Sequence, residues 1–283
     1  MVRSLRTALI LSILVLLAAY LRWPWASSTN QRRATASPQA STDMAAALKV
    51  LTVTPRAKHT ATIIFVHGLG DTGYGWKPVA DMFAAEMQHV KWVLPHAPSI
   101  PVTANGGMKM PGWFDIYEFG GAINAREDEE GMLKTVHALN QLITAEVDAG
   151  IPADRILLGG FSQGAAMSLL TGLTTERRLA GLAVLSGWLP LRLKIKAMMS
   201  DHAKKLPIFW GHGKADPIVR YDRATMSLEY IKSQLNLNAP VAPEKVLEGG
   251  IEFHSYEGLP HSVDDQELVD LKTFLKKVLP SQD

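Results

Sequence analysis

The stretch that decides the fold runs Arg155-Ile156-Leu157-Leu158-Gly159-Gly160-Phe161-Ser162-Gln163-Gly164-Ala165-Ala166-Met167-Ser168-Leu169-Leu170. Residues 155–159 predict a buried strand, and residues 165–170 predict a helix. Between them, Gly160 to Gly164 match G-x-S-x-G, which is typical of a nucleophile elbow at a tight strand-to-helix turn. A Cβ at either glycine would collide with the neighbouring strand or helix. The pattern predicts that Ser162 is a nucleophile; the alternative is a glycine-rich turn with an unused serine.

Strands and helices alternate on both sides of this stretch. Apolar runs rich in β-branched residues predict strands at Leu48–Thr54, Ala61–His67, Val90–Leu94, Ile156–Phe161, Leu179–Leu185, Ile208–Trp210 and Ile251–Tyr256. Such alternation favours a mainly parallel central sheet with helices on both faces. The sequence therefore predicts one α/β domain over residues 48–283.

Two of the intervening helices have clear apolar stripes. The first is expected to begin near Arg126, where four consecutive acids suit the positive end of a helix. Its predicted buried stripe is Leu133, Val136, Leu139 or Asn140, Ile143 and Val147. The last helix is expected to begin at Ser262, with Asp265 three residues later in a pattern close to a capping box. Its predicted buried stripe is Leu268, Leu271, Leu275 and Val278.

A serine nucleophile needs a base within hydrogen-bond reach and an acid that orients the base. In this architecture the acid and the histidine follow the serine in the chain and lie on loops after strands. Asp216 follows the strand around Ile208–Trp210, and its alternative role is a helix N-cap. His261 lies between the last strand and the last helix, and its alternative role is an exposed turn histidine.

Two backbone N–H groups are expected to form an oxyanion hole. One belongs to Gln163, the residue after the nucleophile, and the other to Leu69 in the glycine-rich loop His67-Gly68-Leu69-Gly70. A phosphate-binding loop is the competing interpretation of these glycines. The pattern G-x-x-x-x-G-K-[ST] does not occur in the chain, whereas Gly68 to Gly73 do match G-x-G-x-x-G, so a phosphate-binding loop stays the alternative.

The composition excludes several other kinds of site. The absence of cysteine excludes disulfides, thiolate catalysis and cysteine-ligated metals, and no metal-ligand spacing of the H-E-x-x-H type occurs, so we expect no metal and no cofactor. Five of the 29 Lys and Arg residues and one of the 27 acids fall in residues 1–43. The rest of the chain, with 24 bases and 26 acids, has a net charge of −2 and lacks the net positive charge that is typical of a nucleic-acid-binding protein.

Residues 1–25 differ from the rest of the chain. Ala8–Leu21 is apolar apart from Ser12 and Tyr20, and its 14 residues would span ~21 Å as a helix, short of a ~30 Å hydrocarbon core. A retained membrane anchor, a cleaved signal peptide ending near residue 28, and an organellar or wrongly assigned N-terminus all stay open. Residues 26–47 are rich in Ser, Thr, Ala and Gln and predict a flexible linker.

Five motifs together resemble one known family. They are His67 to Gly73, Pro101 to Met108 with Trp113 to Ile116, Gly160 to Gly164, Gly213 to Val219, and Tyr256 to Ser262. Over about residues 48–280 the chain is similar to the acyl-protein thioesterase branch of the phospholipase/carboxylesterase family. The resemblance implies an α/β-hydrolase fold, a triad of Ser162, Asp216 and His261, and oxyanion donors at Leu69 and Gln163. It also implies a loop over residues 95–121, expected to lack regular structure, that covers an acyl channel.

The resemblance makes Met110, Trp113 and Phe114 candidates for the walls of that channel, although as core aromatics Trp113 and Phe114 need no such role. It implies hydrolysis of S-acylated protein cysteines. A lysophospholipase or general carboxylesterase is the near alternative, and a catalytically silent α/β-hydrolase binding module is the alternative of another class. The N-terminal segment departs from the family. It leaves open a membrane-associated enzyme with a cytosolic active site, a cytoplasmic enzyme, or a secretory-pathway enzyme if residues 1–28 are a signal peptide; oligomeric state is not predicted.

Overall fold

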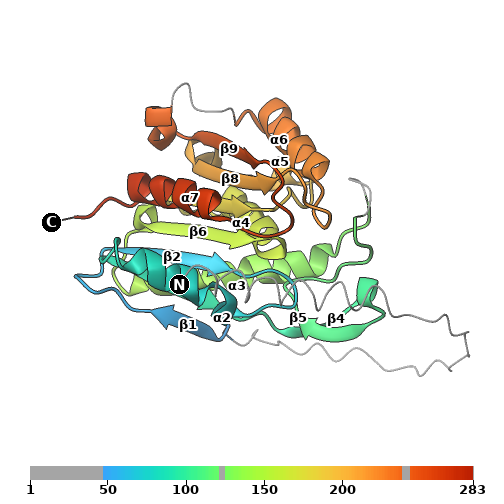
Figure 1. Ribbon diagram of the computed structural model, residues 1–283, viewed down its shortest axis with the longest axis horizontal. Coiled ribbons are helices and arrows are strands. Elements are labelled where there is room, and N and C mark those ends of the chain that lie inside the picture. Colours follow the sequence, from blue (N-terminus) through green and yellow to red (C-terminus); the bar gives the residue numbers. More distant parts are fainter. Residues whose placement is uncertain (1–46, 121–124, 238–242, 283) are drawn as a thin grey trace, which may run out of the picture.

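A seven-stranded sheet forms the centre of the computed structural model, which describes residues 47–120, 125–237 and 243–282 (Figure 1). The strand order is β1-β3-β2-β6-β7-β8-β9. The strands are β1 (Val50–Val53), β2 (Ala61–Val66), β3 (Val90–Pro95), β6 (Ile156–Phe161), β7 (Gly181–Leu185), β8 (Pro207–Gly213) and β9 (Gly250–Tyr256). Strand β1 pairs antiparallel with β3, and every other neighbouring pair in this sheet is parallel.

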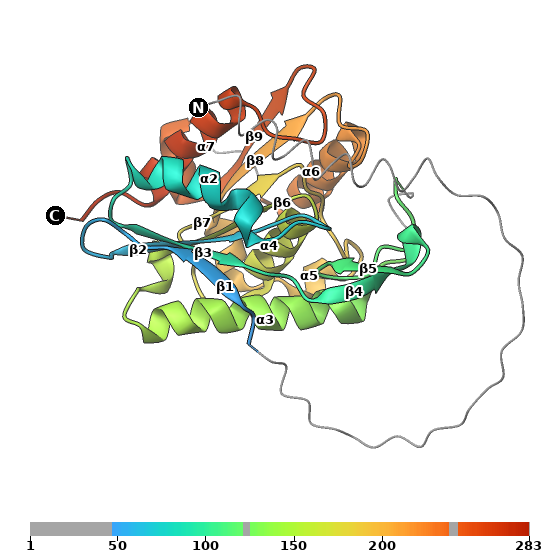
Figure 2. The same cartoon turned by 60° about the horizontal axis from the view of Figure 1, so that its bottom comes forward.

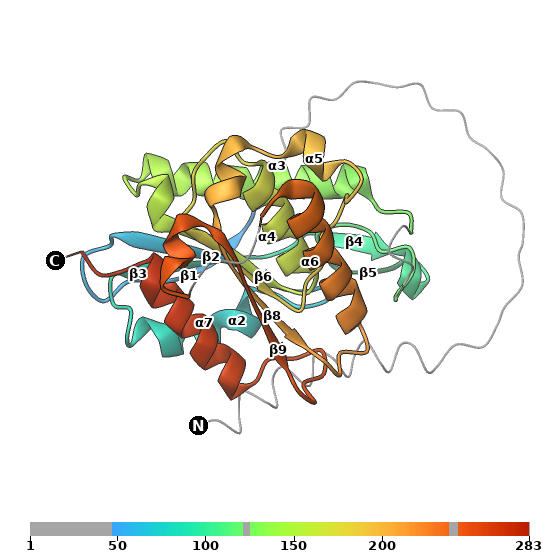
Figure 3. The same ribbon diagram turned by 90° about the horizontal axis from the view of Figure 1, so that it is seen from above.

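Helices cover both faces of the sheet (Figures 2 and 3). The α-helices are α2 (Gly73–Ala84), α3 (Glu129–Asp148), α4 (Gln163–Thr174), α5 (Ile195–Met198), α6 (Tyr221–Leu235) and α7 (Asp265–Val278). Short 3-10 helices occur at η1 (Thr103–Asn105), η2 (Ala153–Arg155), η3 (Asp201–Lys205) and η4 (Pro243–Glu248). Helices α2 and α7 share one apolar cluster with the sheet, and α3, α4 and α6 share the other. This is the α/β-hydrolase arrangement that the resemblance implied.

The middle strands are buried on both faces, which explains their continuous apolar sequence. Every residue of β2, β6, β7 and β8 is buried. The parallel register aligns the ends of neighbouring strands, since Val66 pairs with Gly160 and Phe161 with Leu185. The loops that follow β2, β6, β8 and β9 therefore leave the sheet at one edge, where parallel sheets usually carry their ligand sites.

The expected starts of two helices were wrong by a few residues. Helix α3 begins at Glu129 rather than near Arg126, because the carboxylate of Asp128 caps it by accepting the N–H of Gly131. Its buried residues are Met132, Thr135, Leu139, Ile143 and Glu146, whereas Leu133 is 40% exposed. The start of the buried stripe was therefore predicted one residue too late.

Helix α7 begins at Asp265 rather than at Ser262. Asp264 is its N-cap and accepts the N–H of Glu267 at 2.8 Å, so Ser262 stays in the preceding loop with His261. The predicted stripe of Leu268, Leu271, Leu275 and Val278 is buried as expected, because a shifted start leaves the helical period unchanged.

The segment expected to lack regular structure, residues 95–121, contains a hairpin. Strands β4 (Ser99–Val102) and β5 (Met108–Pro111) pair antiparallel as a separate two-stranded sheet. Gly106 and Gly107 turn the chain between them with φ of 64° and 78°, a conformation in which glycine lacks the strain of other residues. The two prolines in this hairpin make its strands hard to recognise in the sequence. They are tolerated because a proline at the edge of a two-stranded ribbon removes no hydrogen bond of a central strand.

The predicted anchor or signal over residues 1–25 and nearly all of the linker over 26–47 lie outside the described residues. None of the helices in the described ranges combines the length and the apolar composition needed to cross a bilayer. The boundary at residue 48 stays a prediction.

Candidate active site

A strained turn between β6 and α4 holds Ser162. Its backbone has φ 56° and ψ −119°, and its N–H donates to the carbonyl of Leu185 at 2.9 Å. Gly164 makes the turn possible, because a Cβ at that position would lie 2.1 Å from the carbonyl oxygen of Val66. A nonglycine residue at positive φ persists only where its surroundings enforce it, and such strain is concentrated at functional sites.

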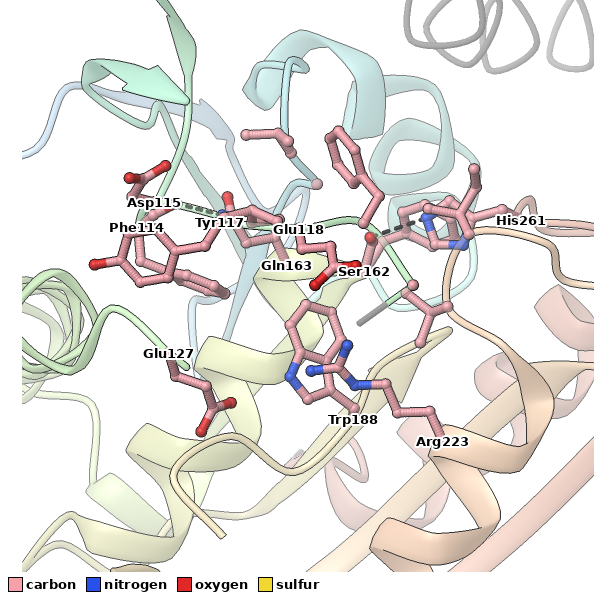
Figure 4. Close-up of a pocket in the computed structure, with 18 of the residues that line it drawn as sticks. Phe114, Asp115, Tyr117, Glu118, Glu127, Ser162, Gln163, Trp188, Arg223 and His261 are labelled. Carbon is pink, nitrogen blue, oxygen red and sulfur yellow. Dashed lines mark hydrogen bonds between the residues drawn. The ribbon is translucent and has the colours of Figure 1, made fainter. Parts of the chain in front are cut away.

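Ser162, His261 and Asp216 form a continuous hydrogen-bonded chain. His261 Nε2 lies 2.9 Å from Ser162 Oγ (Figure 4). His261 Nδ1 lies 2.7 Å from Asp216 Oδ2. A carboxylate accepts but does not donate, so the imidazole proton belongs on Nδ1 and Nε2 is free to accept the serine proton. The three side chains come from loops after β6, β8 and β9, and each residue is no more than 9% exposed.

Asp216 is fixed by the loop that carries it. Its Oδ1 accepts the backbone N–H groups of Ile218 at 2.8 Å and Val219 at 2.9 Å, which leaves Oδ2 for His261. The N-cap of α6 is Arg220, so Asp216 does not have the helix-capping role considered as its alternative. Likewise, His261 is 5% exposed and is not an exposed turn histidine.

Backbone hydrogen bonds join the acid loop to the histidine loop. The N–H of Ala215 donates to Leu259 at 3.2 Å, and the N–H of Lys214 donates to Tyr256 at 2.9 Å. Together these bonds fix the separation between Asp216 and His261 through the main chain.

A second buried imidazole, His212, lies behind Asp216. His212 Nε2 is 2.8 Å from the carbonyl of Val219 and 3.7 Å from Asp216 Oδ2, and burial lowers the pKa of its side chain. Its hydrogen bond to Val219 directs this nitrogen to the acid loop, whereas His261 is the imidazole within hydrogen-bond distance of Ser162.

His67 orients the peptide group that carries the predicted oxyanion donor Leu69. His67 Nε2 accepts the N–H of Ala97 at 3.1 Å, so the proton is on Nδ1, which donates to the carbonyl of Gly68 at 2.7 Å. In a trans peptide the C=O and the next N–H point in opposite directions. The Leu69 N–H therefore points away from the His67 ring. No role for the His67 side chain was predicted from the sequence. The available signal for it was the position of His67 next to Gly68, in the loop that carries Leu69.

Gln163 supports the same region with its side chain. Its Oε1 accepts the N–H of Trp113 at 2.9 Å, and its Nε2 donates to the carbonyl of Phe114 at 2.8 Å. Trp113 Nε1 in turn donates to the carbonyl of His67 at 2.8 Å. The two loops beside Ser162 are thus tied together, and Trp113 belongs to that support.

A cavity of about 260 Å³ opens beside Ser162 and His261. Most of its lining is apolar and aromatic, as expected of a site for a small or lipidic group, and includes Trp76, Phe114, Phe119, Phe161, Trp188 and Ile218. Of the three wall candidates, Phe114 lines the cavity, whereas Met110 and Trp113 do not. Met110 lies on β5, where Asn105 Nδ2 is 3.4 Å from its sulfur, and Trp113 is buried between His67 and Gln163.

Within the described residues we find no group of three or more His, Asp or Glu side chains that could hold a metal ion. The geometry beside Ser162 is instead that of nucleophilic catalysis with a hydrogen-bonded base.

His67 is expected to make stability depend on pH. Burial lowers its pKa from the ordinary 6.5 to about 4, so between these values the unfolded chain binds more protons than the folded protein. The free energy of unfolding should therefore fall as the pH falls below 6.5, and this residue should account for about 2–3 kcal/mol at pH 4.5.

Urea unfolding at pH 7.5 and pH 4.5 measures this contribution. His67→Asn keeps a donor near the Gly68 carbonyl but does not titrate, so its stability should fall by about 2–3 kcal/mol less than that of the wild type. The exposed His137 on α3 provides the control variant His137→Asn. Equal losses in all three proteins would contradict a buried neutral His67.

Comparison with known proteins agrees with this fold and geometry. The model of the phospholipase/carboxylesterase family matches residues 49–279. Acyl-protein thioesterase 1 of Cryptococcus neoformans is 50% identical over 83% of this chain and 100% of its own length. The corresponding protein of Mycosarcoma maydis is 44% identical over 83% of this chain and 99% of its own.

Among solved structures, acyl-protein thioesterase 2 of Zea mays superposes with a TM-score of 0.70 and 28% identity. That match covers 82% of this chain and 99% of the maize protein. The family match spans nearly the whole described part, and the relatives are covered almost end to end. The chain therefore belongs to the phospholipase/carboxylesterase family.

Proposed function

We propose that this protein is a serine hydrolase that removes long-chain acyl groups from S-acylated protein cysteines. The observation that carries the proposal is the hydrogen-bonded chain from Ser162 through His261 to Asp216, with distances of 2.9 and 2.7 Å. Ser162 is the nucleophile, His261 the general base and acid, and Asp216 the residue that fixes the tautomer of His261.

The reaction proceeds through an acyl-enzyme. Ser162 Oγ attacks the thioester carbonyl while its proton passes to His261 Nε2, and the N–H groups of Leu69 and Gln163 stabilise the oxyanion. Collapse of the intermediate breaks the C–S bond, and the cysteine sulfur leaves with the proton from His261. A water molecule then attacks the acyl-enzyme with His261 again as base, which releases the fatty acid and restores Ser162.

Two observations support an S-acyl substrate. The relatives named acyl-protein thioesterase 1 are covered almost completely by this chain, at 44–50% identity. The cavity beside Ser162 has largely apolar walls, which suit an acyl chain. A lysophospholipase or general carboxylesterase is the second candidate, because the same oxyanion forms in a thioester and an oxygen ester.

Turnover on matched substrates tests the proposal. The full chain should hydrolyse an S-palmitoyl peptide with a higher kcat/KM than lysophosphatidylcholine or the corresponding O-palmitoyl serine peptide. Ser162→Ala serves as the background control for each substrate. A preference for either oxygen ester would replace the thioesterase assignment, and hydrolysis of none of them would support the silent binding module.

We further propose that residues 8–25 contact a membrane while the active site faces the cytosol, where S-acylated cysteines are substrates. A tether would raise the encounter rate with membrane-bound substrates through effective concentration. Protease protection in sealed vesicles tests the topology. Digestion of the catalytic domain without detergent is the expected result, whereas protection until detergent is added would indicate a secretory-pathway enzyme with residues 1–28 as its signal.

A further inference from the structure

Arg223 places a cation in the wall of the catalytic cavity. It lies in the first turn of α6 and lines the same cavity as Ser162 and His261. Its Cζ is 4.6 Å from the centre of the Trp188 ring, and Figure 4 shows the two side chains next to each other. One face of the guanidinium is thus covered by an aromatic ring, while the five N–H donors around its edge need acceptors.

Those donors have no protein acceptor in the described part of the chain. No hydrogen bond is formed by the Arg223 side chain there, and no carboxylate oxygen lies within 4.0 Å of its nitrogens. Two other arginines illustrate the usual pairing: Arg220 binds Asp222 at 2.6 Å, and Arg155 donates to two carbonyls. Arg223 is half-buried, and a partly desolvated cation that lacks a protein acceptor would be stabilised by an anionic group that enters the cavity.

Glu127 is the carboxylate whose charge acts on Arg223, and it already has a structural partner. Its Oε2 accepts the N–H of Leu191 at 2.8 Å, and Leu191 has a strained φ of 49° that this bond helps to hold. Burial raises the pKa of Glu127 and lowers that of Arg223, and a guanidinium stays charged at neutral pH after such a shift. Glu127 therefore weakens the positive potential of Arg223 without forming an ion pair.

The other charged groups of the lining do not neutralise Arg223. Asp71 accepts the N–H of Thr72, Asp115 accepts the N–H of Thr103, Glu118 is exposed, and Arg126 lies over the Tyr117 ring. Helix α6 does not explain the cation, because its N-terminus carries a partial positive charge that favours acids. The position of Arg223 is therefore explained better by a ligand than by the stability of the helix.

We propose that Arg223 is a specificity-determining residue that binds an anionic group, a carboxylate or phosphate, on the substrate of the adjacent Ser162. The proposal rests on the hydrolase function and deepens it. The anion can belong to the acyl group, at its distal end, or to the leaving group beside the scissile bond. Both sources place a negative charge against the same guanidinium, where bidentate charge-assisted bonds are possible.

Two pairs of equal-length substrates separate the sources. On the acyl side, p-nitrophenyl hydrogen glutarate is compared with p-nitrophenyl valerate. On the leaving-group side, the S-pentanoyl thioester of 3-mercaptopropionate is compared with that of 3-mercaptopropionamide. The full-length protein should prefer the anionic member of one pair about 10- to 100-fold in kcat/KM, the range of a charge-assisted hydrogen bond.

Three variants test whether the preference for the anionic substrate depends on Arg223. Arg223→Gln should abolish the preference while turnover of the neutral substrates stays within a few fold, and Arg223→Lys should retain part of it because the charge remains. Arg220→Gln removes an equal charge from the start of the same helix, outside the cavity lining, and should leave the preference unchanged. Long-range steering would disappear in 0.5 M NaCl, whereas direct pairing in the cavity should persist.

Equal rates within both pairs, or a preference that survives in Arg223→Gln, would overturn the proposal. Absence of hydrolysis of all four substrates would contradict the hydrolase function instead. In that case equilibrium binding of the intact substrates to Ser162→Ala protein still tests Arg223. Tighter binding of an anionic member, lost on adding Arg223→Gln, is the expected result, and equal binding contradicts the inference.

Discussion

Replacement of Ser162 by alanine is expected to lower kcat about 10⁶-fold, the size of the loss when a triad serine is removed in a related mechanism. The substitution deletes the one atom that attacks the carbonyl and leaves His261 Nε2 without its partner at 2.9 Å. The protein should remain folded, because the backbone bond from the Ser162 N–H to Leu185 does not involve the side chain.

Covalent labelling by a fluorophosphonate probe provides the independent measurement. Wild-type protein should react at Ser162 Oγ with loss of fluoride, and the variant should not react. Ser168→Ala is the matched control, since Ser168 is a buried serine of α4 outside the cavity lining. More than a few per cent of residual activity in Ser162→Ala, with circular dichroism unchanged, would exclude Ser162 as the nucleophile.

Asp216→Asn should lower kcat about 10⁴-fold for a different reason. The N–H groups of Ile218 and Val219 both point at Oδ1, so the asparagine oxygen must take that position and its NH₂ must face His261. Because two donors cannot share a hydrogen bond, the proton of His261 is driven from Nδ1 to Nε2. The imidazole can then no longer accept the proton of Ser162.

The defect should appear in kcat with a small change in KM, because Asp216 does not line the cavity. Asp222→Asn, which alters an exposed ion pair on α6, is the matched control and should retain wild-type activity. If Asp216→Asn kept more than about a tenth of the wild-type kcat, another group would have to orient His261. The buried His212, at 3.7 Å from Asp216, would not replace it, since it lacks a carboxylate's charge.

The parts of this structure that could be predicted depend on local pattern. The strands around Ile156–Phe161 and Ala61–Val66 are continuous apolar runs, and parallel topology brings their ends to one edge. The meeting of Ser162 with His261 followed from chain order and loop position. Their catalytic roles, with those of Leu69 and Gln163, stay proposals that the variants above test.

The predictions that were wrong depended on contacts that a local sequence pattern does not reveal. The start of α3 depends on a cap at Asp128, and the direction of Trp113 depends on partners distant in sequence, His67 and Gln163. The β4–β5 hairpin is short and rich in proline, so its sequence lacks the alternation of apolar and polar residues that would have predicted paired strands. Arg223 could not be placed at the cavity from sequence, because its neighbour Trp188 comes from the loop after β7.

The main-chain bonds between the acid loop and the histidine loop have a consequence for protein engineering. A Cβ at Gly213 would lie 2.1 Å from the carbonyl oxygen of Leu259, so the two loops also touch without room for a side chain. Residues 213–216 and 256–261 should therefore be transplanted between homologous scaffolds as one cassette. Libraries that randomise either loop alone would mostly sample misregistered pairs.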